Sequence, residues 1–216
     1  MIKFNHVSKR YPGGFEVLSD VNFNVTKGEL VFLTGHSGAG KTTLLRLIAK
    51  LEQPSMGDIT VDNIQLNNLK ARDVAAYRSR LGIIFQTPTL LMNQSVFANV
   101  ALPLTMQNMT ASIITKRVHA ALDMVGLLNK EKLRPLSLST GEQQRVGIAR
   151  AVVHKPTLLL ADEPTGNLDP KLSAEILDIF VQFNQVGVSI LLATHDLALI
   201  ANMRHRIVML KGGRLC

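Results

Sequence analysis

Residues 35–43, Gly-His-Ser-Gly-Ala-Gly-Lys-Thr-Thr, constrain the fold of this chain more than any other segment. They match the pattern Gly-x-x-x-x-Gly-Lys-Ser/Thr, in which backbone N–H groups close around phosphate oxygens. The apolar run at 30–33 predicts a buried strand before the loop, and apolar residues at helical spacing predict a helix over 43–51. Because strand, glycine loop and helix follow in this order, we predict a phosphate site rather than a chance turn.

Two carboxylates follow another apolar run, at 157–161. They supply acidic groups for metal binding and proton transfer, which the phosphate loop does not contain. The strand predicted there ends in Asp162, which we expect to hold Mg²⁺ together with the Thr42 hydroxyl. Glu163 is the expected general base for an attacking water, and Lys41 is expected to reach the β- and γ-phosphates. A buried strand followed by an acidic turn is the alternative, and the pairing with the loop makes it the weaker one.

The order of apolar and helical segments predicts an α/β fold. Continuous apolar runs at 81–85, 158–161, 189–193 and 207–210 are typical of strands in a parallel sheet covered by helices. Alternating segments at 2–7 and 58–62 predict further strands near the N-terminus. Residues 87–155 are mainly helical in pattern, which indicates a helical subdomain inserted between the parts 1–86 and 156–216 of a single domain.

Residues 138–146 open a predicted helix in which Ser139 is the N-cap and Glu142 completes a capping box. A capped helix alone would explain these residues, but Gly141 beside a helix N-terminus also makes an anion site. With this segment about a hundred residues after the loop, the whole chain resembles the ATPases of ABC transporters. The resemblance extends to Tyr11 (adenine-stacking aromatic), Gln86 (Q-loop), residues 167–169 including Asn167 and Asp169 (D-loop) and His195 (switch histidine).

This resemblance implies a P-loop NTPase fold with a RecA-like core, an N-terminal antiparallel β subdomain and an inserted helical subdomain. It also implies an ATP-dependent homodimer in which each ATP lies between Lys41 of one copy and Ser139 and Gly141 of the other. Catalysis is assigned to Glu163, His195, Gln86 and Lys41, and Mg²⁺ to Thr42, Gln86 and Asp162. The expected nucleotide contacts are Tyr11, Gly35, His36, Ser37, Gly38, Ala39, Gly40, Lys41, Thr42, Thr43, Gln86, Ser139, Gly141, Glu142 and Asp169.

One position departs from the family pattern: Thr140 stands where the signature normally has its first glycine. Its β-branched side chain either crowds the dimer interface, and so lowers activity, or points outward without effect.

Within the family, residues 32–45, 84–86, 99–104 and 161–169 resemble the bacterial cell-division members. That likeness implies an integral membrane partner, a place in the division machinery and a location on the cytoplasmic face of the membrane. ATPases of lipoprotein-release or macrolide-efflux transporters share the segment 161–169 and stay as an alternative. A soluble family member acting on nucleic acid or ribosomes is the alternative from a different class.

The charge pattern disfavours that last alternative. The chain has 24 basic and 16 acidic residues, a formal charge of +8, but the basic residues are scattered along the sequence. Proteins that bind nucleic acid usually concentrate them on one stripe, so we expect no such binding. The lone cysteine, Cys216, suits a reducing compartment, and we expect neither a secretory signal nor a membrane span.

Overall fold

The phosphate loop joins the central strand of a mainly parallel sheet to the helix that follows it. The computed structural model describes residues 1–166, 168–201 and 203–216. The sheet has the strand order β10-β9-β3-β8-β7-β6, with β10 antiparallel and the other strands parallel. Its strands are β3 (Leu30–Thr34), β6 (Leu81–Ile84), β7 (Leu158–Asp162), β8 (Ser189–Ala193), β9 (Arg206–Lys211) and β10 (Arg214–Leu215). The α/β prediction is therefore confirmed.

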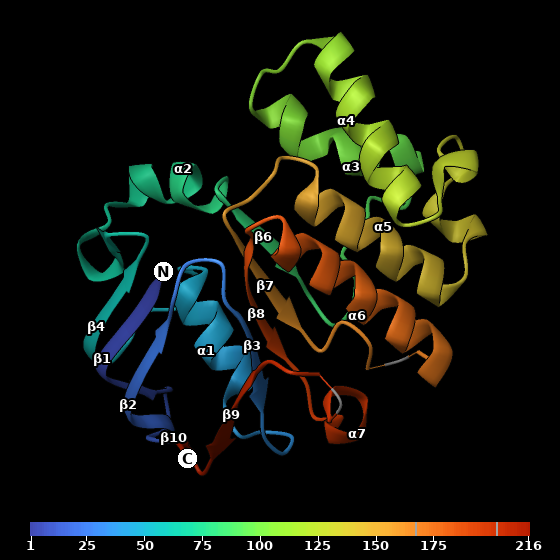
Figure 1. Ribbon diagram of the computed structural model, residues 1–216. Helices are drawn as coiled ribbons and strands as arrows, with labels where there is room; N and C mark the ends of the chain where they lie inside the picture. The colour runs from blue at the N-terminus through green and yellow to red at the C-terminus, as the bar shows by residue number, and fades with distance from the viewer. Residues whose placement is uncertain (167, 202) are drawn as a thin grey trace.

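A smaller antiparallel sheet stands beside this sheet, on the left of Figure 1. Its order is β2-β1-β4-β5, and its strands are β1 (Ile2–Arg10), β2 (Glu16–Val25), β4 (Met56–Val61) and β5 (Ile64–Gln65). Strand β2 pairs with β1 along most of its length, yet the sequence analysis did not single it out. Register shifts interrupt that pairing, and the alternation of buried and exposed residues is regular only over 21–25.

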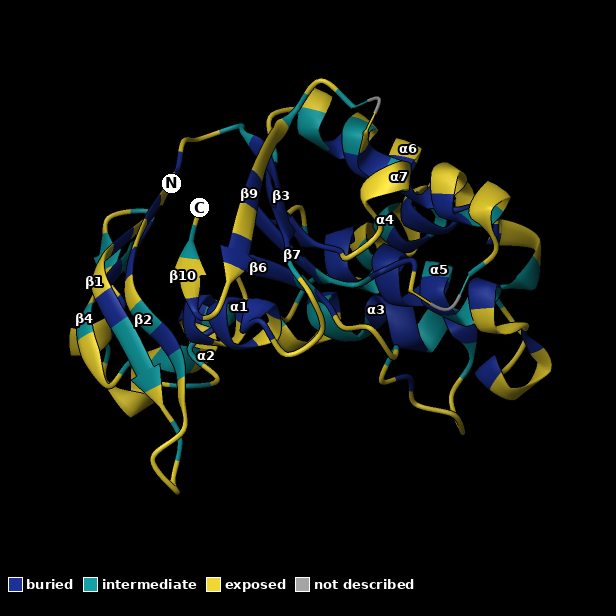
Figure 2. Cartoon of the chain, turned by 90° about the horizontal axis from the view of Figure 1, so that it is seen from below, coloured by how far each residue is buried: buried dark blue, intermediate teal, exposed yellow. Residues whose placement is uncertain are grey.

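Helices cover the parallel sheet on both faces, as Figures 1 and 2 show. The side chains of β3 explain why: Val31 and Leu33 face one cluster with helix α1, while Leu30 and Phe32 face another with α5 and α6. The helices are α1 (Lys41–Ile48), α2 (Val74–Arg78), α3 (Val96–Met106), α4 (Ala111–Met124), α5 (Thr140–Val152), α6 (Pro170–Gln185) and α7 (Leu197–Ile200). Short 3₁₀ turns are η1 (Leu66–Asn68), η2 (Ala71–Asp73), η3 (Leu128–Lys130) and η4 (Pro135–Ser137).

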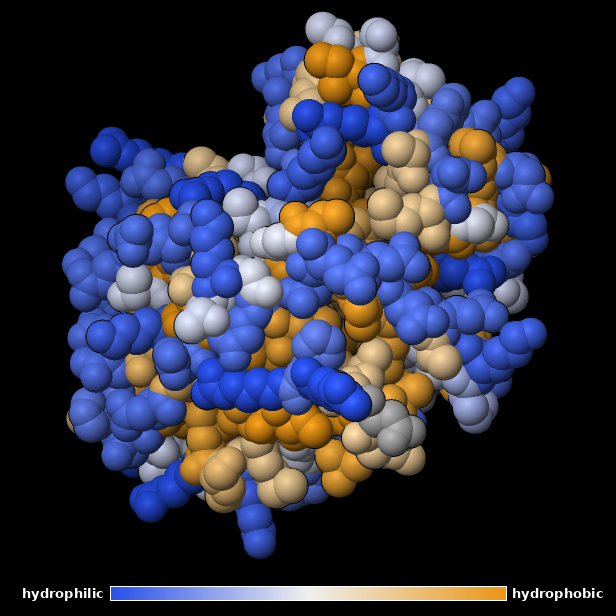
Figure 3. Space-filling model, in the orientation of Figure 1, coloured by the Kyte–Doolittle hydropathy of each residue, from blue (hydrophilic) through white to orange (hydrophobic). Residues whose placement is uncertain are grey.

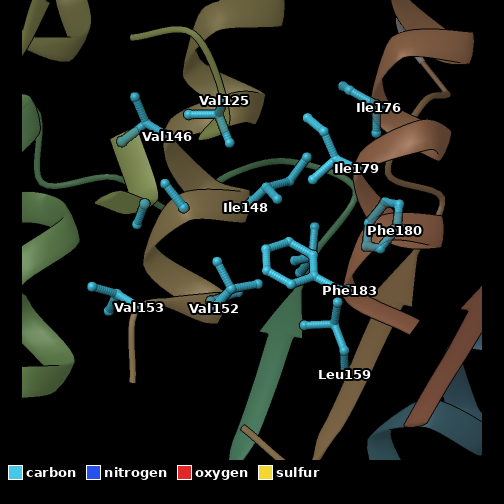
Figure 4. Packing of buried hydrophobic residues seen from close by; sticks show 14 of the residues in the cluster. Val125, Val146, Ile148, Val152, Val153, Leu159, Ile176, Ile179, Phe180 and Phe183 are labelled. Atoms are coloured by element: carbon cyan, nitrogen blue, oxygen red, sulfur yellow. The ribbon is translucent and has the colours of Figure 1, made fainter. Parts of the chain in front are cut away.

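Helices α5 and α6 share one apolar core above β7. Figure 4 shows Ile148 and Val152 of α5 and Phe180 and Phe183 of α6 pointing toward one another over Leu159. Phe180 is only 1% exposed. Packing in the C-terminal halves of the two helices therefore holds α5 and α6 side by side.

Helix ends follow the sequence rules closely. Ser139 caps α5 in a complete capping box with Glu142, and Asp169 caps α6 by accepting from Leu172 N at 3.0 Å. The Ser139 cap was predicted from the sequence, and the Asp169 cap depends on the same local pattern of an N-cap side chain and the residues after it.

Candidate nucleotide-binding site

Backbone conformation explains two glycines of the phosphate loop. Gly35 has φ 149°, and a Cβ there would lie 2.3 Å from the carbonyl oxygen of Leu210 on β9. Gly40 has φ 105°, which disfavours any L side chain, and its Cβ would meet Leu18 at 2.9 Å. Gly40 is also the N-cap of α1 and offers no side-chain acceptor. The first-turn N–H groups of α1 therefore carry no side-chain cap, which suits them to an anion.

Lys41 lies across this loop with its charge directed into it. Its Nζ donates to the carbonyl of Gly35 at 2.7 Å and to that of His36 at 3.2 Å. The same ammonium lies 3.3 Å from Glu163 Oε1, and the Lys41 side chain is only 5% exposed. Two neutral carbonyls and one carboxylate thus hold the buried Lys41 ammonium at the mouth of the loop. Phosphate oxygens of a bound ligand can replace these partners.

A cleft of about 660 Å³ opens above the loop. It brings together residues from β2, the loop with the start of α1, and the ends of β6, β7 and β8. The residues that line it are Val17, His36, Ser37, Gly38, Ala39, Gly40, Lys41, Thr42, Thr43, Gln86, Glu163 and His195. Tyr11 reaches the same loop from the antiparallel sheet, with its hydroxyl 3.4 Å from Thr43 Oγ1, and Lys9 Nζ lies 4.8 Å from the centre of its ring.

Glu163 and His195 meet at the carboxyl ends of adjacent strands β7 and β8. His195 Nδ1 lies 2.5 Å from Glu163 Oε2, so Glu163 touches Lys41 with one oxygen and His195 with the other. Glu163 has φ 48°, an unfavourable conformation for a non-glycine residue, and its N–H donates to the Ala193 carbonyl at 2.9 Å. Strain of this kind is characteristic of functional sites, where the surrounding fold imposes it.

The surroundings of Asp162 show whether these residues suit the expected Mg²⁺. Its Oδ1 is buried and has no hydrogen-bond partner among the residues that the structure describes. Burial raises the pKa of this carboxyl, and hydrogen bonding from the Thr42 side chain opposes that rise. An unpaired buried carboxylate oxygen beside a hydroxyl is a fitting pair of oxygen ligands for a hard divalent cation. The residues present therefore fit the ion.

The remaining predicted contacts lie outside this cleft. Ser139, Gly141 and Glu142 form the first turn of α5, and Asp169 begins α6. A Cβ on Gly141 would come within 2.3 Å of Leu172, so the two helix starts pack tightly. Thr140, whose effect the sequence left open, is exposed at the first position of α5. The predicted D-loop residue Asn167 lies outside the described residues.

Comparison with known proteins gives the family. The model of the ABC transporter family matches residues 18–166, which contain the phosphate loop, Asp162 and Glu163. The chain belongs to the ABC transporter family. The cell division ATP-binding protein FtsE of Escherichia coli K12 is 54% identical over 215 residues, covering 100% of this chain and 97% of its own. FtsE of Bacillus subtilis is 38% identical, with 99% and 93% covered.

Solved structures of ABC cassettes agree with this fold. A dimeric post-hydrolysis form of the cassette MJ0796 bound to ADP and Pi superposes with a TM-score of 0.92 at 35% identity, covering 100% of this chain and 96% of that one. CbiO1 of Clostridium perfringens, part of the transporter complex cbiONQ, gives 0.91 at 30% identity, with 100% and 86% covered.

The sequence analysis missed two residues that lie near the predicted nucleotide contacts. Val17 lines the cleft, but it belongs to the irregular first half of strand β2, which the sequence analysis did not single out. Lys130 forms an ion pair with Glu142. Its only sequence signal is a positive charge that precedes a capping-box glutamate by twelve positions, which is too common a pattern to single it out.

Proposed function

We propose that this chain is the ATP-hydrolysing subunit of a membrane complex in bacterial cell division, with the integral membrane protein FtsX as its partner. The observation that carries the ATPase part is the convergence of Lys41, Glu163 and His195 in one cleft. The cell-division part is supported by the relatives named FtsE, which match at 38–54% identity over nearly the whole chain. In such a complex, ATP turnover at the cytoplasmic face would regulate cell-wall hydrolases rather than move a solute.

The predicted site residues have distinct roles in this proposal. Lys41, the N–H groups of residues 35–43 and the start of α1 bind the phosphates, and Tyr11 supports the adenine. Thr42, Asp162 and Gln86 hold Mg²⁺, which neutralises phosphate charge. Glu163 accepts a proton from the attacking water, and His195 fixes the orientation of the Glu163 carboxylate through its Nδ1 contact.

A second copy of the chain completes the site. Ser139 and Gly141 lie at the N-terminus of α5 and do not line the cleft that holds Lys41. We propose that a head-to-tail dimer presents this helix N-terminus to the ATP bound by the other copy, with Asp169 nearby on α6. The dimeric form of the related cassette MJ0796 supports this arrangement. ATP then bridges the two copies, and hydrolysis removes the bridge.

An apolar groove beside Gln86 is the proposed docking place of the membrane partner. Its apolar lining includes Leu45, Leu51, Ile83 and Phe85, of which Leu51 and Phe85 are 38% and 41% exposed. Thr42 and Asp162, the proposed Mg²⁺ ligands, line the same groove. The neighbouring Leu91 and Met92 are also exposed. On the face that Figure 3 shows, hydrophobic residues are interspersed with hydrophilic ones.

The fully buried Asn99 fixes the loop that carries Leu91. Its side chain accepts from the N–H of Leu91 at 2.7 Å and donates to the carbonyls of Leu91 and Ser95, each at 3.0 Å. Across the described parts of the chain, no helix is both long enough and apolar enough to cross a bilayer. We propose that the partner attaches the chain to the membrane.

Co-purification tests the partner assignment. The chain carrying Leu91→Glu and Met92→Glu should lose most of its recovery with co-expressed FtsX while its ATP binding stays near the parent value. Val186→Glu, at a position 78% exposed at the end of α6, is the matched control and should co-purify normally. Equal recovery of all three chains would move the partner away from this groove. Recovery with a lipoprotein-release or efflux permease in place of FtsX would favour that alternative.

Light scattering tests the composite site. With Glu163→Gln as background, ATP-Mg²⁺ should convert the chain from monomer to dimer, and Ser139→Arg should prevent this without weakening ATP binding by the single chain. Ser137→Arg, two positions earlier and also exposed, controls for the added side chain. A Ser139→Arg chain that dimerises and hydrolyses ATP normally would leave the α5 N-terminus as an ordinary capped helix.

A further inference from the structure

An ion pair outside the cleft controls the charge at the start of α5. Lys130, the last residue of η3, places its Nζ 2.5 Å from Glu142 Oε1. The other carboxylate oxygen, Oε2, accepts the N–H of Ser139 at 3.0 Å, and Ser139 Oγ accepts the N–H of Glu142 at 3.3 Å. Both oxygens of Glu142 are therefore occupied, one by the helix cap and one by Lys130.

A carboxylate at this place opposes phosphate binding. The N-terminus of α5 attracts anions because its N–H groups and helix dipole are positive, but a negative charge at the third helical position cancels much of that field. Glu142 stays ionised at neutral pH, since the Lys130 ammonium and the Ser139 N–H lower its pKa. Without a counter-charge, the same residue that caps the helix would repel an incoming phosphate.

The backbone around Lys130 is fixed by helix α3. The N–H of Phe97 donates to the Glu131 carbonyl and that of Val96 to the Leu133 carbonyl, each at 2.8 Å. The Lys130 carbonyl in turn accepts the Leu133 N–H at 3.0 Å. The side chain of Lys130 is about one-third exposed and that of Glu142 about one-sixth, so water screens the pair only in part. Lys130 is thus held in place before any nucleotide arrives.

We propose that Lys130 is a positioning residue for the ATP held by a second copy of the chain. It cancels the charge of Glu142 and holds that carboxylate in the capping box, so that the N-terminus of α5 can accept the γ-phosphate across the dimer interface. Glu142, predicted from sequence as a nucleotide contact, then supports the contact instead of making it. This inference rests on the composite site proposed above.

The test measures the ATP-Mg²⁺ concentration for half-maximal dimerisation in the Glu163→Gln background by light scattering. Lys130→Met should raise it about threefold, while ATP binding by the single chain is unchanged. A loss of about threefold at each of two symmetric sites lowers the dimerisation constant about tenfold, and dimerisation depends on the square of the ATP concentration. Lys130→Arg should restore dimerisation. Lys132→Met removes the same charge two positions away and should have no effect, because Lys132 forms no ion pair within residues 1–166, 168–201 and 203–216.

A double variant separates charge from folding. Glu142→Gln keeps a hydrogen-bonding side chain in the capping box but removes the charge, so Lys130→Met should cause no further loss in that background. A further loss there, or normal dimerisation of Lys130→Met, overturns the role of Lys130. If Glu163→Gln itself stays monomeric with ATP, the composite site fails, and the inference fails with it. This last outcome is distinguishable from the others, because it concerns the Glu163→Gln chain with Lys130 and Glu142 unchanged.

Discussion

Replacing Glu163 with glutamine should affect binding and turnover in opposite directions. Glu163 is the proposed general base, and it is also the carboxylate that lies 3.3 Å from Lys41 Nζ. ATP must therefore compete with Glu163 for the Lys41 ammonium. The amide keeps the size of the side chain and removes both its charge and its basicity.

The distance sets the scale of the effect on binding. At 3.3 Å two unit charges attract by about 5 kcal/mol at an effective dielectric constant of about 20, and by about 1.3 kcal/mol in water. Most of this attraction is offset by the solvation that each charge recovers, so we expect a net gain of about 1 kcal/mol in ATP binding. The Kd for ATP should fall about fivefold. Turnover should fall by about 10²-fold or more, on the scale of a lost general base.

Equilibrium ATP binding at low protein concentration, where the chain stays monomeric, and steady-state phosphate release measure the two effects separately. Glu175→Gln is the matched control, because Glu175 pairs with Arg145 on the α5–α6 face and does not line the cleft. Near-normal turnover of Glu163→Gln would remove Glu163 from the general-base role. Weaker ATP binding by the variant would show that the Lys41–Glu163 contact does not compete with phosphate.

Three further results are expected. Tyr11→Ala should weaken ATP binding about five- to tenfold in a titration while Tyr11→Phe changes it little, because a stacked ring contributes about 1 kcal/mol and needs no hydroxyl. Phe180→Ala should lower the free energy of unfolding by about 3–5 kcal/mol in urea, since this ring is 1% exposed, whereas Val186→Ala should change it by less than about 0.5 kcal/mol. Binding to DNA or RNA should be weak and unspecific, and a steep decrease in a tight affinity with added salt would contradict the dispersed-charge prediction.

The chemistry of the loop and the class of the fold were predictable from the order of the amino acids. Glycines at 35 and 40, a lysine and a threonine specify a phosphate loop because the constraint is local: those positions need positive φ and close backbone approach. The continuous apolar runs of β7 and β8 likewise reveal strands buried on both faces. Caps at Ser139 and Asp169 were predictable for the same reason, since each depends on residues within three positions.

Which of these residues come into contact depends on the arrangement of the strands and helices in space. Glu163 contacts Lys41 and His195, each far away in the chain, because β7 and β8 are neighbours in the sheet and β3 lies next to β8. That strand order is not encoded in any single segment, and neither is the approach of Lys130 to Glu142 across the loop between α4 and α5. Strand β2 carries a clear local signal only over 21–25, where buried and exposed residues alternate, because register shifts break the pattern before that. Local patterns report the environment of one segment, whereas distances between segments follow from how all of them pack together.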